Sequence, residues 1–393
     1  MPSAATHVSE VVPALSIRFN SIVYELKARG TDVIVLSLGE AFFDIPLFDF
    51  AEMPIPESYH YNQSRGNPDL RRLLAGYYGR QYGVAVDADT EILVTAGSKA
   101  AIYMSLMAIL NPGDEVLVLE PAWVSYSEQV RLCHGVPVMV PYHQPVFGLE
   151  GFITPRTRAV IVNNPNNPSG RVMSRVELEH LHALADRYDL FLISDEAYSD
   201  FLLDDRFISC GVLDPQKRHT IVVNSMSKNY GMSGWRIGYV IGNSGLIDEV
   251  LKINQHLITC PPTILEYYLV RHFHDVLEIT KPQIADVVRR RCQMADFMEE
   301  LGISCLPGDA TFYLFASIEP STLDSMEFCT RLLRDHHVCA VPGIGYGTSC
   351  DRYIRISVGA EDAERVREGI RRIRGLIDAT SPVPSEVVDL VPL

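Results

Sequence analysis

The sequence predicts an α/β fold, with a large domain around a mostly parallel seven-stranded sheet and a smaller α+β domain. Between residues 61 and 275, seven short runs of Val, Ile and Leu alternate with helical patterns. Such runs are typical of strands buried on both faces, as in a parallel sheet covered by helices. After Pro282 the pattern changes to a long helix, a hydrophobic strand and charged helices. A chain of 393 residues is long enough for two or three domains.

The first sixty residues are expected to hold one helix and one strand. Residues 1–13 show no ordered pattern, whereas residues 16–28 follow a helical pattern that ends at Gly30. Residues 33–38 form an apolar run typical of a strand. Three prolines within residues 41–60 interrupt helical hydrogen bonding, so we expect an irregular loop near the pocket.

The alternating region supplies the elements of the sheet and its cover. Helices are expected over residues 69–82, 98–110 and 177–188. The expected strands are residues 91–95, 116–119, 136–140, 159–163, 190–194, 220–224 and 237–241.

The remainder predicts the smaller domain, followed by an extended, proline-containing tail over residues 379–393. Its expected elements are a long helix from 282 to 301, a strand at 312–316, a helix at 324–336, a strand at 354–357 and a helix at 360–376.

The composition argues against several kinds of partner. The formal net charge is −15, from 34 basic and 49 acidic residues, which does not suit nucleic acid or an anionic membrane. The eight cysteines have no metal-ligand spacing, so we expect reduced thiols and no metal site. The start lacks a signal-peptide pattern, and no apolar run approaches the ~20 residues that span a bilayer. We therefore expect a cytoplasmic protein that acts on small molecules.

Polar residues collect where the predicted strands end. Ligands of open α/β sheets bind at the carboxyl ends of the strands, so these side chains are expected to share one pocket. The residues are Gly97, Ser98, Asn167, Asp195, Tyr198, Ser225, Lys228 and Arg236.

Lys228 is the centre of this set. A lysine is costly to bury and is seldom placed at the end of a buried strand without a task, so we infer that it carries a covalently bound cofactor. Pyridoxal 5′-phosphate needs such a lysine for an imine and a carboxylate opposite the pyridine nitrogen. It also needs donors at the ring oxygen, and helix N-terminal amides, hydroxyls and an arginine for the phosphate.

Several motifs occur together in one order along the chain. They are Tyr61 with Gly66, Asn166-Asn167-Pro168-Ser169-Gly170, Ser194-Asp195-Glu196-x-Tyr198, Ser225-x-Ser227-Lys228, Gly234-Trp235-Arg236-Ile237-Gly238, and Arg355 within Ile-Arg-Ile-Ser. With them, residues 26–373 resemble the class I/II, fold type I, pyridoxal-phosphate-dependent aminotransferases.

The resemblance implies a role for each matching residue. Lys228 is the imine lysine and then the general base, Asp195 pairs with the pyridinium, and Tyr198 with Asn167 contacts the ring oxygen. Trp123 stacks on the ring, and the phosphate is bound by Gly97, Ser98, the amide of Lys99, Ser225 and Arg236. The α-carboxylate of the substrate is bound by Arg355 with the amide of Gly39.

The resemblance also implies a homodimer with shared active sites, because Tyr61 corresponds to the tyrosine that reaches the phosphate in the neighbouring subunit. We expect residues 47–280 to form the large domain, and residues 1–46 with 281–393 to form the small domain. The expected reaction transfers the amino group of an L-α-amino acid to a 2-oxo acid in a ping-pong cycle.

The chain departs from the family pattern in the segment expected to cover the substrate side chain. Gly39-Glu40-Ala41-Phe42-Phe43-Asp44 stands where the family usually has Gly-Glu-Pro-Asp-Phe, and residues 46–61 are short and proline-rich. Glu40 and Asp44 are candidates for binding a cationic side chain.

Two other functions remain open at this stage. One is elimination or cyclisation on an arginine-like amino acid, as in enzymes resembling capreomycidine synthase, since it needs the same lysine, aspartate and arginine. The other is a non-catalytic cofactor-binding regulator, which the acidic net charge disfavours.

Overall fold

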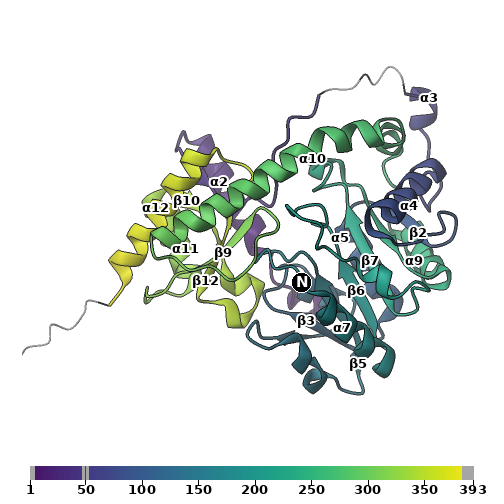
Figure 1. Ribbon diagram of the computed structural model, residues 1–393, viewed down its shortest axis with the longest axis horizontal. Helices are drawn as coiled ribbons and strands as arrows, with labels where there is room; N and C mark the ends of the chain where they lie inside the picture. The colour runs from purple at the N-terminus through teal and green to yellow at the C-terminus, as the bar shows by residue number, and fades with distance from the viewer. Residues whose placement is uncertain (1–4, 47–48, 50–52, 383–393) are drawn as a thin grey trace, which may run out of the picture.

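A central seven-stranded sheet organises the larger part of the molecule (Figure 1). The computed structural model describes residues 5–46, 49 and 53–382. Only β8 runs antiparallel to its neighbours, which confirms the mostly parallel sheet. The order of strands across the sheet is β2 (Ile92–Thr95), β8 (Gly238–Ile241), β7 (Thr220–Ser225), β6 (Phe191–Asp195), β5 (Thr157–Asn163), β3 (Glu115–Leu119) and β4 (Val136–Val140).

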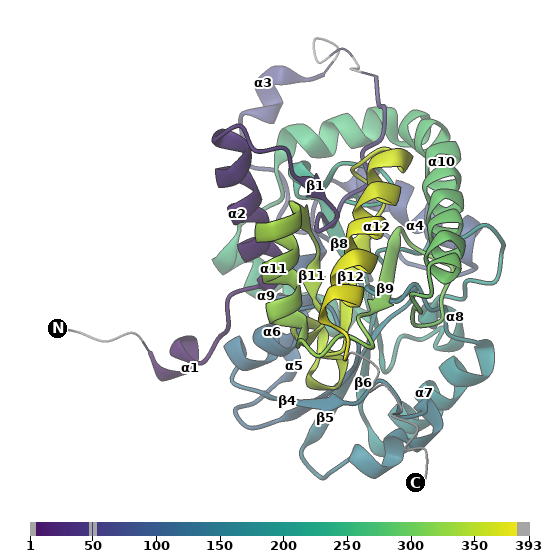
Figure 2. The same cartoon turned by 90° about the vertical axis from the view of Figure 1, so that its left-hand side faces the viewer.

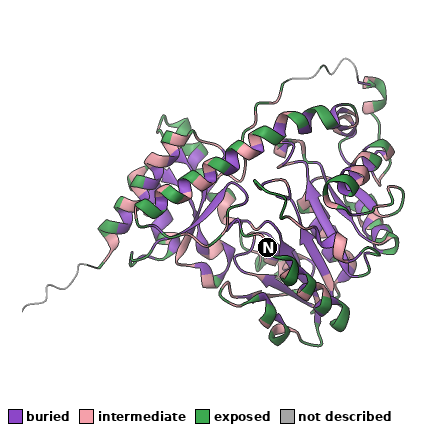
Figure 3. Ribbon diagram, in the orientation of Figure 1, coloured by how far each residue is buried: buried purple, intermediate pink, exposed green. Residues whose placement is uncertain are grey.

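Helices cover both faces of this sheet because successive strand side chains point to opposite faces. Val116 and Val118 of β3 pack in one cluster with residues of α5, α6 and α9, whereas Leu117 packs in another with residues of α7. Apart from β4 at the edge of the sheet, the strands are almost wholly buried (Figure 3). These helices are α5 (Ser98–Ile109), α6 (Tyr126–Leu132), α7 (Arg175–Tyr188) and α9 (Ser244–Leu257), and α4 (Pro68–Tyr82) packs nearby.

A second core lies at the other end of the molecule, with α11 and α12 toward the viewer in Figure 2. Phe19 and Val23 of α2 pack there with residues of β9, α11 and α12, so the first and last parts of the chain share this core. Its sheets are β11 (Val341–Pro342), β12 (Tyr353–Ser357) and β9 (Tyr313–Ser317), and the pair β1 (Ile34–Val35) with β10 (Val338–Cys339). Its helices are α2 (Leu15–Ala28), α11 (Ser325–His336) and α12 (Ala363–Thr380).

One long helix, α10 (Thr263–Glu300), runs between the two cores (Figure 1). The prediction that this helix begins at Pro282 is wrong, because Pro282 lies inside it. Proline removes a single helical hydrogen bond, whereas Leu269 and Phe273 on one side and Ile284 and Val288 on the other are buried in the two cores. The predicted domain boundary at residue 280 falls within α10, in the part that follows its kink at His272.

Other differences are smaller. Helices α6 and α9 were not predicted, although Asn243 caps α9 by accepting from the Leu246 amide. The irregular region 41–60 holds only α3 (Ile55–Ser58) among its described residues, and one turn, α1 (Thr6–Ser9), lies in the segment 1–13. The predicted tail at 379–393 begins within α12, and residues 383–393 lie outside the described part of the chain.

Candidate active site

A cavity of about 440 Å³ brings together most of the predicted site residues. It receives side chains from the carboxyl ends of β6 and β7, from the start of α5, and from β9 and β12 of the second core. The predicted residues that line it are Gly39, Glu40, Ser98, Lys99, Trp123, Asn167, Asp195, Tyr198, Ser225, Lys228, Arg236 and Arg355.

Lys228 lies just beyond the end of β7, in a turn that the hydroxyl group of Ser225 stabilises. Ser225 Oγ accepts a hydrogen bond from the Ser227 amide at 3.0 Å. Lys228 Nζ donates to the carbonyl of Gly39, and it lies 5.6 Å from the ring centroid of Tyr198. Lys228 Nζ therefore has one polar contact, with Gly39, and one aromatic neighbour, Tyr198. It faces the cavity.

Asp195 ends β6 and is buried at the floor of the cavity. The Tyr126 hydroxyl donates to its Oδ2 at 2.6 Å, and the Ala197 amide donates to its Oδ1 at 3.1 Å. Burial raises the pKa of Asp195, although these donors and the charge of Lys228 act in the opposite direction. A cation placed against this desolvated carboxylate would be strongly favoured.

Asn167 and Tyr198 meet beside the lysine. Asn167 Nδ2 donates to Tyr198 Oη at 3.4 Å, and the Asn167 amide is held by Asn163 Oδ1 at 2.6 Å. Burial raises the pKa of Tyr198 far above its ordinary value, so its hydroxyl stays protonated and can donate. Asn167 Oδ1 is buried without a hydrogen-bond partner among the described residues. One hydrogen-bond acceptor at the wall of the cavity is therefore unused.

An anion site is formed where α5 begins. Gly97 has φ 86°, and a Cβ atom there would lie 2.4 Å from Arg236 Nη2. A Cβ atom on Gly238 would lie 2.4 Å from the Ser98 amide. The two glycines thus let a guanidinium and free helix N-terminal amides approach one point, and the Ser227 hydroxyl lies 3.3 Å from Arg236 Nη1. This donor set suits a phosphate dianion.

Arg355 is a buried cation held without a carboxylate. Its Nη2 donates to the carbonyl of Ser37, and its Cζ lies 4.5 Å from the ring centroid of Tyr313. Its Nε has no hydrogen-bond partner within the described part of the chain. A guanidinium with an unused donor at a cavity wall is suited to bind a carboxylate.

The side chain of Lys99, a residue of which only the amide was assigned to the phosphate, is exposed but also lines the cavity. Its Nζ lies 5.0 Å from the ring centroid of Trp123, and Trp123 packs edge-on against Tyr126. Partial burial and the neighbouring charge of Arg236 lower the pKa of Lys99.

The two acidic candidates for the substrate end differ in position. Glu40 lines the cavity and accepts a hydrogen bond from Ser233 Oγ at 2.6 Å. Asp44 does not line it, and its backbone pairs with the side chain of Gln283 on α10.

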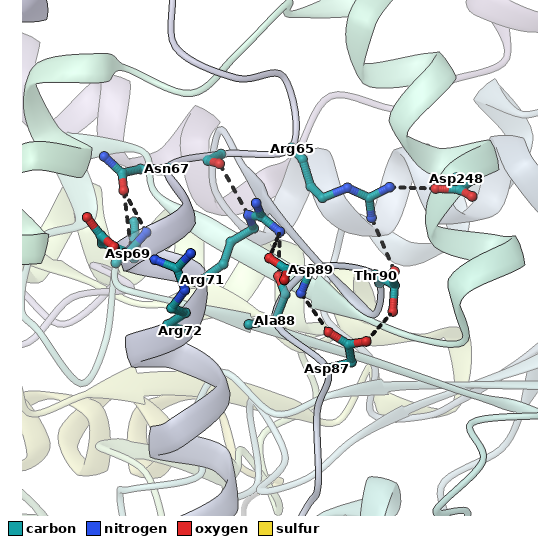
Figure 4. Close-up of polar contacts among 12 residues, drawn as sticks. Arg65, Asn67, Asp69, Arg71, Arg72, Asp87, Ala88, Asp89, Thr90 and Asp248 are labelled. Carbon is teal, nitrogen blue, oxygen red and sulfur yellow. Dashed lines mark hydrogen bonds and ion pairs between the residues drawn. The ribbon is translucent and has the colours of Figure 1, made fainter.

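Tyr61 lies outside the cavity, with 85% of its surface exposed. The segment after it is firmly held: Asn67 caps α4 through the Asp69 and Leu70 amides, and Arg71 donates to the carbonyls of Gly66 and Ala88 (Figure 4). The side chain of Tyr61 is therefore exposed at the surface, and the segment that follows it is held in place by hydrogen bonds.

Sequence reasoning missed several residues of the cavity. Tyr313 has no polar motif around it, because it sits in a hydrophobic strand, and no motif assigned a role to Tyr126. One face of α2 also lines the cavity, through Ser16, Ile17, Asn20, Ser21 and Tyr24. Their helical spacing was visible, but nothing in it indicated a binding wall.

Comparison with known proteins gives the class to which this fold and site belong. The family model described as "Aminotransferase class I and II" matches residues 55–373. The chain belongs to this family of pyridoxal-phosphate-dependent transferases.

Individual relatives agree with this assignment. The chain is 33% identical to a protein named aspartate aminotransferase from Pyrococcus abyssi, over 90% of this chain and 94% of that one. It is 31% identical to aromatic-amino-acid aminotransferase 2 of Thermococcus litoralis, over 89% and 93% of the two chains. The structure of Thermus thermophilus aspartate aminotransferase with maleate superposes with a TM-score of 0.87 at 31% identity, covering 96% of this chain and 100% of that one.

These findings confirm the predicted family, fold class, cofactor and enzyme class. Within residues 5–46, 49 and 53–382, no helix is long and apolar enough to cross a membrane. The same residues contain no cluster of His, Cys, Asp and Glu that would hold a metal ion.

Proposed function

We propose that this aminotransferase moves the amino group of an L-α-amino acid to a 2-oxo acid, with pyridoxal phosphate carried on Lys228. One observation carries the proposal: a single cavity holds Lys228 between the carboxylate of Asp195 and the guanidinium groups of Arg236 and Arg355. Each of these charges suits one group of the bound pair, namely the pyridine nitrogen, the phosphate and the substrate carboxylate.

The cofactor, when bound, supplies an aldehyde that condenses with amino groups and a ring that accepts electrons from the substrate Cα. The residues of this chain do the rest. Asp195 would hold the ring nitrogen in its protonated form, because a buried carboxylate is stabilised by a facing cation. Asn167 and Tyr198 would hold the ring oxygen by donating to it, and Trp123 would hold the ring face.

Lys228 Nζ, which lines the cavity, would hold the cofactor and, as a free amine, would serve as the group that accepts the Cα proton of the substrate and returns it. Arg355 and the amide of Gly39 hold the α-carboxylate, so that the Cα–H bond points toward the lysine. The same groups bind the 2-oxo acid in the second half of the cycle.

A test of this proposal starts with the colour of the purified protein. We expect borohydride to fix a phosphopyridoxyl group at Lys228, identified by peptide mass spectrometry. Lys228→Ala should bind cofactor without fixation, whereas Lys252→Ala, which changes an exposed lysine paired with Glu249, should behave as the wild type. Borohydride fixation of the cofactor in Lys228→Ala protein, or fixation at another lysine of the wild type, would overturn the proposal.

An amino-acid panel then distinguishes transamination from elimination or cyclisation. Conversion of bound cofactor to its pyridoxamine form, with a stoichiometric 2-oxo acid, supports transamination. Release of ammonia or water without that conversion would favour the alternative. The relatives reported above are named as aminotransferases, which supports the first outcome.

We further propose that the enzyme is a cytoplasmic homodimer in which Tyr61 reaches the phosphate site of the neighbouring subunit. The exposed side chain of Tyr61 on an anchored loop supports the shared site. The eight cysteines, none of which is in a disulfide, support a reducing compartment.

A further inference from the structure

Tyr313 connects two parts of the cavity that the proposed function treats separately. Its hydroxyl lies 2.9 Å from Tyr198 Oη, on the cofactor side. Its ring lies 4.5 Å from Arg355 Cζ, on the substrate-carboxylate side. The residue is fully buried by protein except where it lines the cavity.

The place of Tyr313 is set by backbone contacts from both cores. In the antiparallel pair β9 and β12, Phe315 is opposite Arg355, so Tyr313 is a diagonal neighbour of Arg355 on the same face. Arg291 of α10 donates to the carbonyl of Tyr313 at 3.0 Å and to the carbonyl of Ser169, next to the Asn167 loop, at 3.2 Å. The backbone under Tyr313 is therefore tied to the loop that holds the cofactor oxygen.

We propose that Tyr313 is a positioning residue with two separable parts: its hydroxyl orients Tyr198 toward the ring oxygen of the cofactor, and its ring holds Arg355 for the substrate carboxylate. This inference rests on the proposed function of the cavity and extends it to a residue that no motif singled out.

The direction of the hydroxyl contact follows from proton counting. A phenol has one proton to donate, and Tyr198 must give its proton to the cofactor oxygen. Tyr313 then donates to Tyr198 Oη, with Asn167 Nδ2 as a second donor to the same oxygen. A hydroxyl that accepts such bonds becomes a stronger donor, because hydrogen bonds in a chain polarise one another. Tyr313 thus helps to stabilise the negative charge on the ring oxygen.

The hydroxyl part is tested by the pH titration of the visible absorption of the resting holoenzyme, a readout that does not depend on turnover. Tyr313→Phe is expected to raise the pKa of this transition by about 0.7 units, since a lost hydrogen bond is worth about 1 kcal/mol and one pKa unit 1.36 kcal/mol. Tyr198→Phe should raise it further. The double variant should match Tyr198→Phe alone, because Tyr313 acts through that hydroxyl.

The chain offers a matched control in Tyr346. Its ring also lies near Arg355, at 5.6 Å from Cζ, but its hydroxyl has no partner among the described residues and it does not line the cavity. Tyr346→Phe should leave the transition unchanged. An unchanged pKa in Tyr313→Phe, an equal shift in Tyr346→Phe, or additive shifts in the double variant would each overturn the role of the hydroxyl.

The ring part is tested by kinetics. Tyr313→Phe keeps the ring and should leave the KM of the best amino acid within about twofold. Tyr313→Leu removes it and should raise that KM roughly 3- to 10-fold, in line with the loss of a cation–π contact. Equal KM values for the two variants would overturn the role of the ring. Failure of wild-type protein to hold cofactor on Lys228 would instead refute the proposed function itself.

Discussion

Charged side chains of the cavity are held by backbone and aromatic groups rather than by opposite charges. Lys228 donates to the carbonyl of Gly39, Arg355 donates to the carbonyl of Ser37, and Asp195 accepts from Tyr126 and Ala197. Among the described residues, none of these three charges has an ion-pair partner. Neutral partners fix the position of a charge but leave it uncompensated, so it remains available to a charged ligand.

Glu40 is the residue at which substrate preference is most directly testable. The Glu40→Gln variant keeps the hydrogen bond from Ser233 Oγ but removes the negative charge. If Glu40 binds a cationic side chain, kcat/KM for lysine and ornithine should fall about 10-fold or more, as for loss of a charge-assisted hydrogen bond. The values for neutral amino acids should stay within about twofold. Unchanged kinetics for both classes would show that Glu40 does not select the side chain.

At the scale of elements, α10 carries a titratable group into the interior of the molecule. Glu266, in its first turn, is fully buried and accepts from the Asn67 amide at 2.8 Å and from Asn62 Nδ2 at 3.1 Å. Burial raises the pKa of Glu266 from 4.5 to about 7, although both donors and the charge of Arg71 act against this. The loop that carries Tyr61 is therefore held by the carboxyl group of Glu266. This group changes its charge near pH 7.

The sign of the resulting pH dependence follows from the raised pKa. The stabilising contribution of Glu266 is fully present below about pH 4.5 and is lost as the pH rises to about 7, because the unfolded chain ionises first. The Glu266→Gln variant should be more stable than the wild type at pH 8, by up to about 3 kcal/mol, and similar to it at pH 5. Urea unfolding at the two pH values measures this difference.

A suitable control is Glu249→Gln on α9, which changes an exposed glutamate. It should show no such dependence on pH. An equal effect of Glu266→Gln at pH 5 and pH 8 would contradict the expected titration.

The elements also show what was predictable from the sequence. All seven strands of the large sheet were predicted, because a strand buried on both faces is a continuous apolar run. The start of α10 was missed, because Pro282 suggested a boundary and the burial that overrides it comes from two cores far apart in sequence. The missed contributions of Tyr313 and of α2 have the same origin, since they depend on tertiary placement.

At the scale of the whole molecule, the proposed dimer gives a test for Tyr61. Tyr61→Phe and Lys228→Ala homodimers should each lose most activity, because one lacks the phosphate contact and the other the lysine. A mixed dimer contains one intact site if Tyr61 serves the neighbouring subunit. Refolding the two variants together should therefore restore roughly a quarter of wild-type activity for random pairing.

Each variant refolded alone provides the control. Sedimentation of the wild type should give twice the mass of one chain. No recovery in the mixture, or a monomeric wild type, would contradict the shared site.

Because α10 supplies residues to both cores, neither core can open without disturbing the other. Opening of the second core would expose Ile284 and Val288, which lie in the part of α10 that follows its kink at His272. We therefore expect the two cores to unfold in one cooperative transition, even though the residues of the cavity come from both of them. Coupling of the cores would hold Arg355 and Lys228 in one cavity, although Arg355 lies in β12 and Lys228 follows β7, which belong to different sheets.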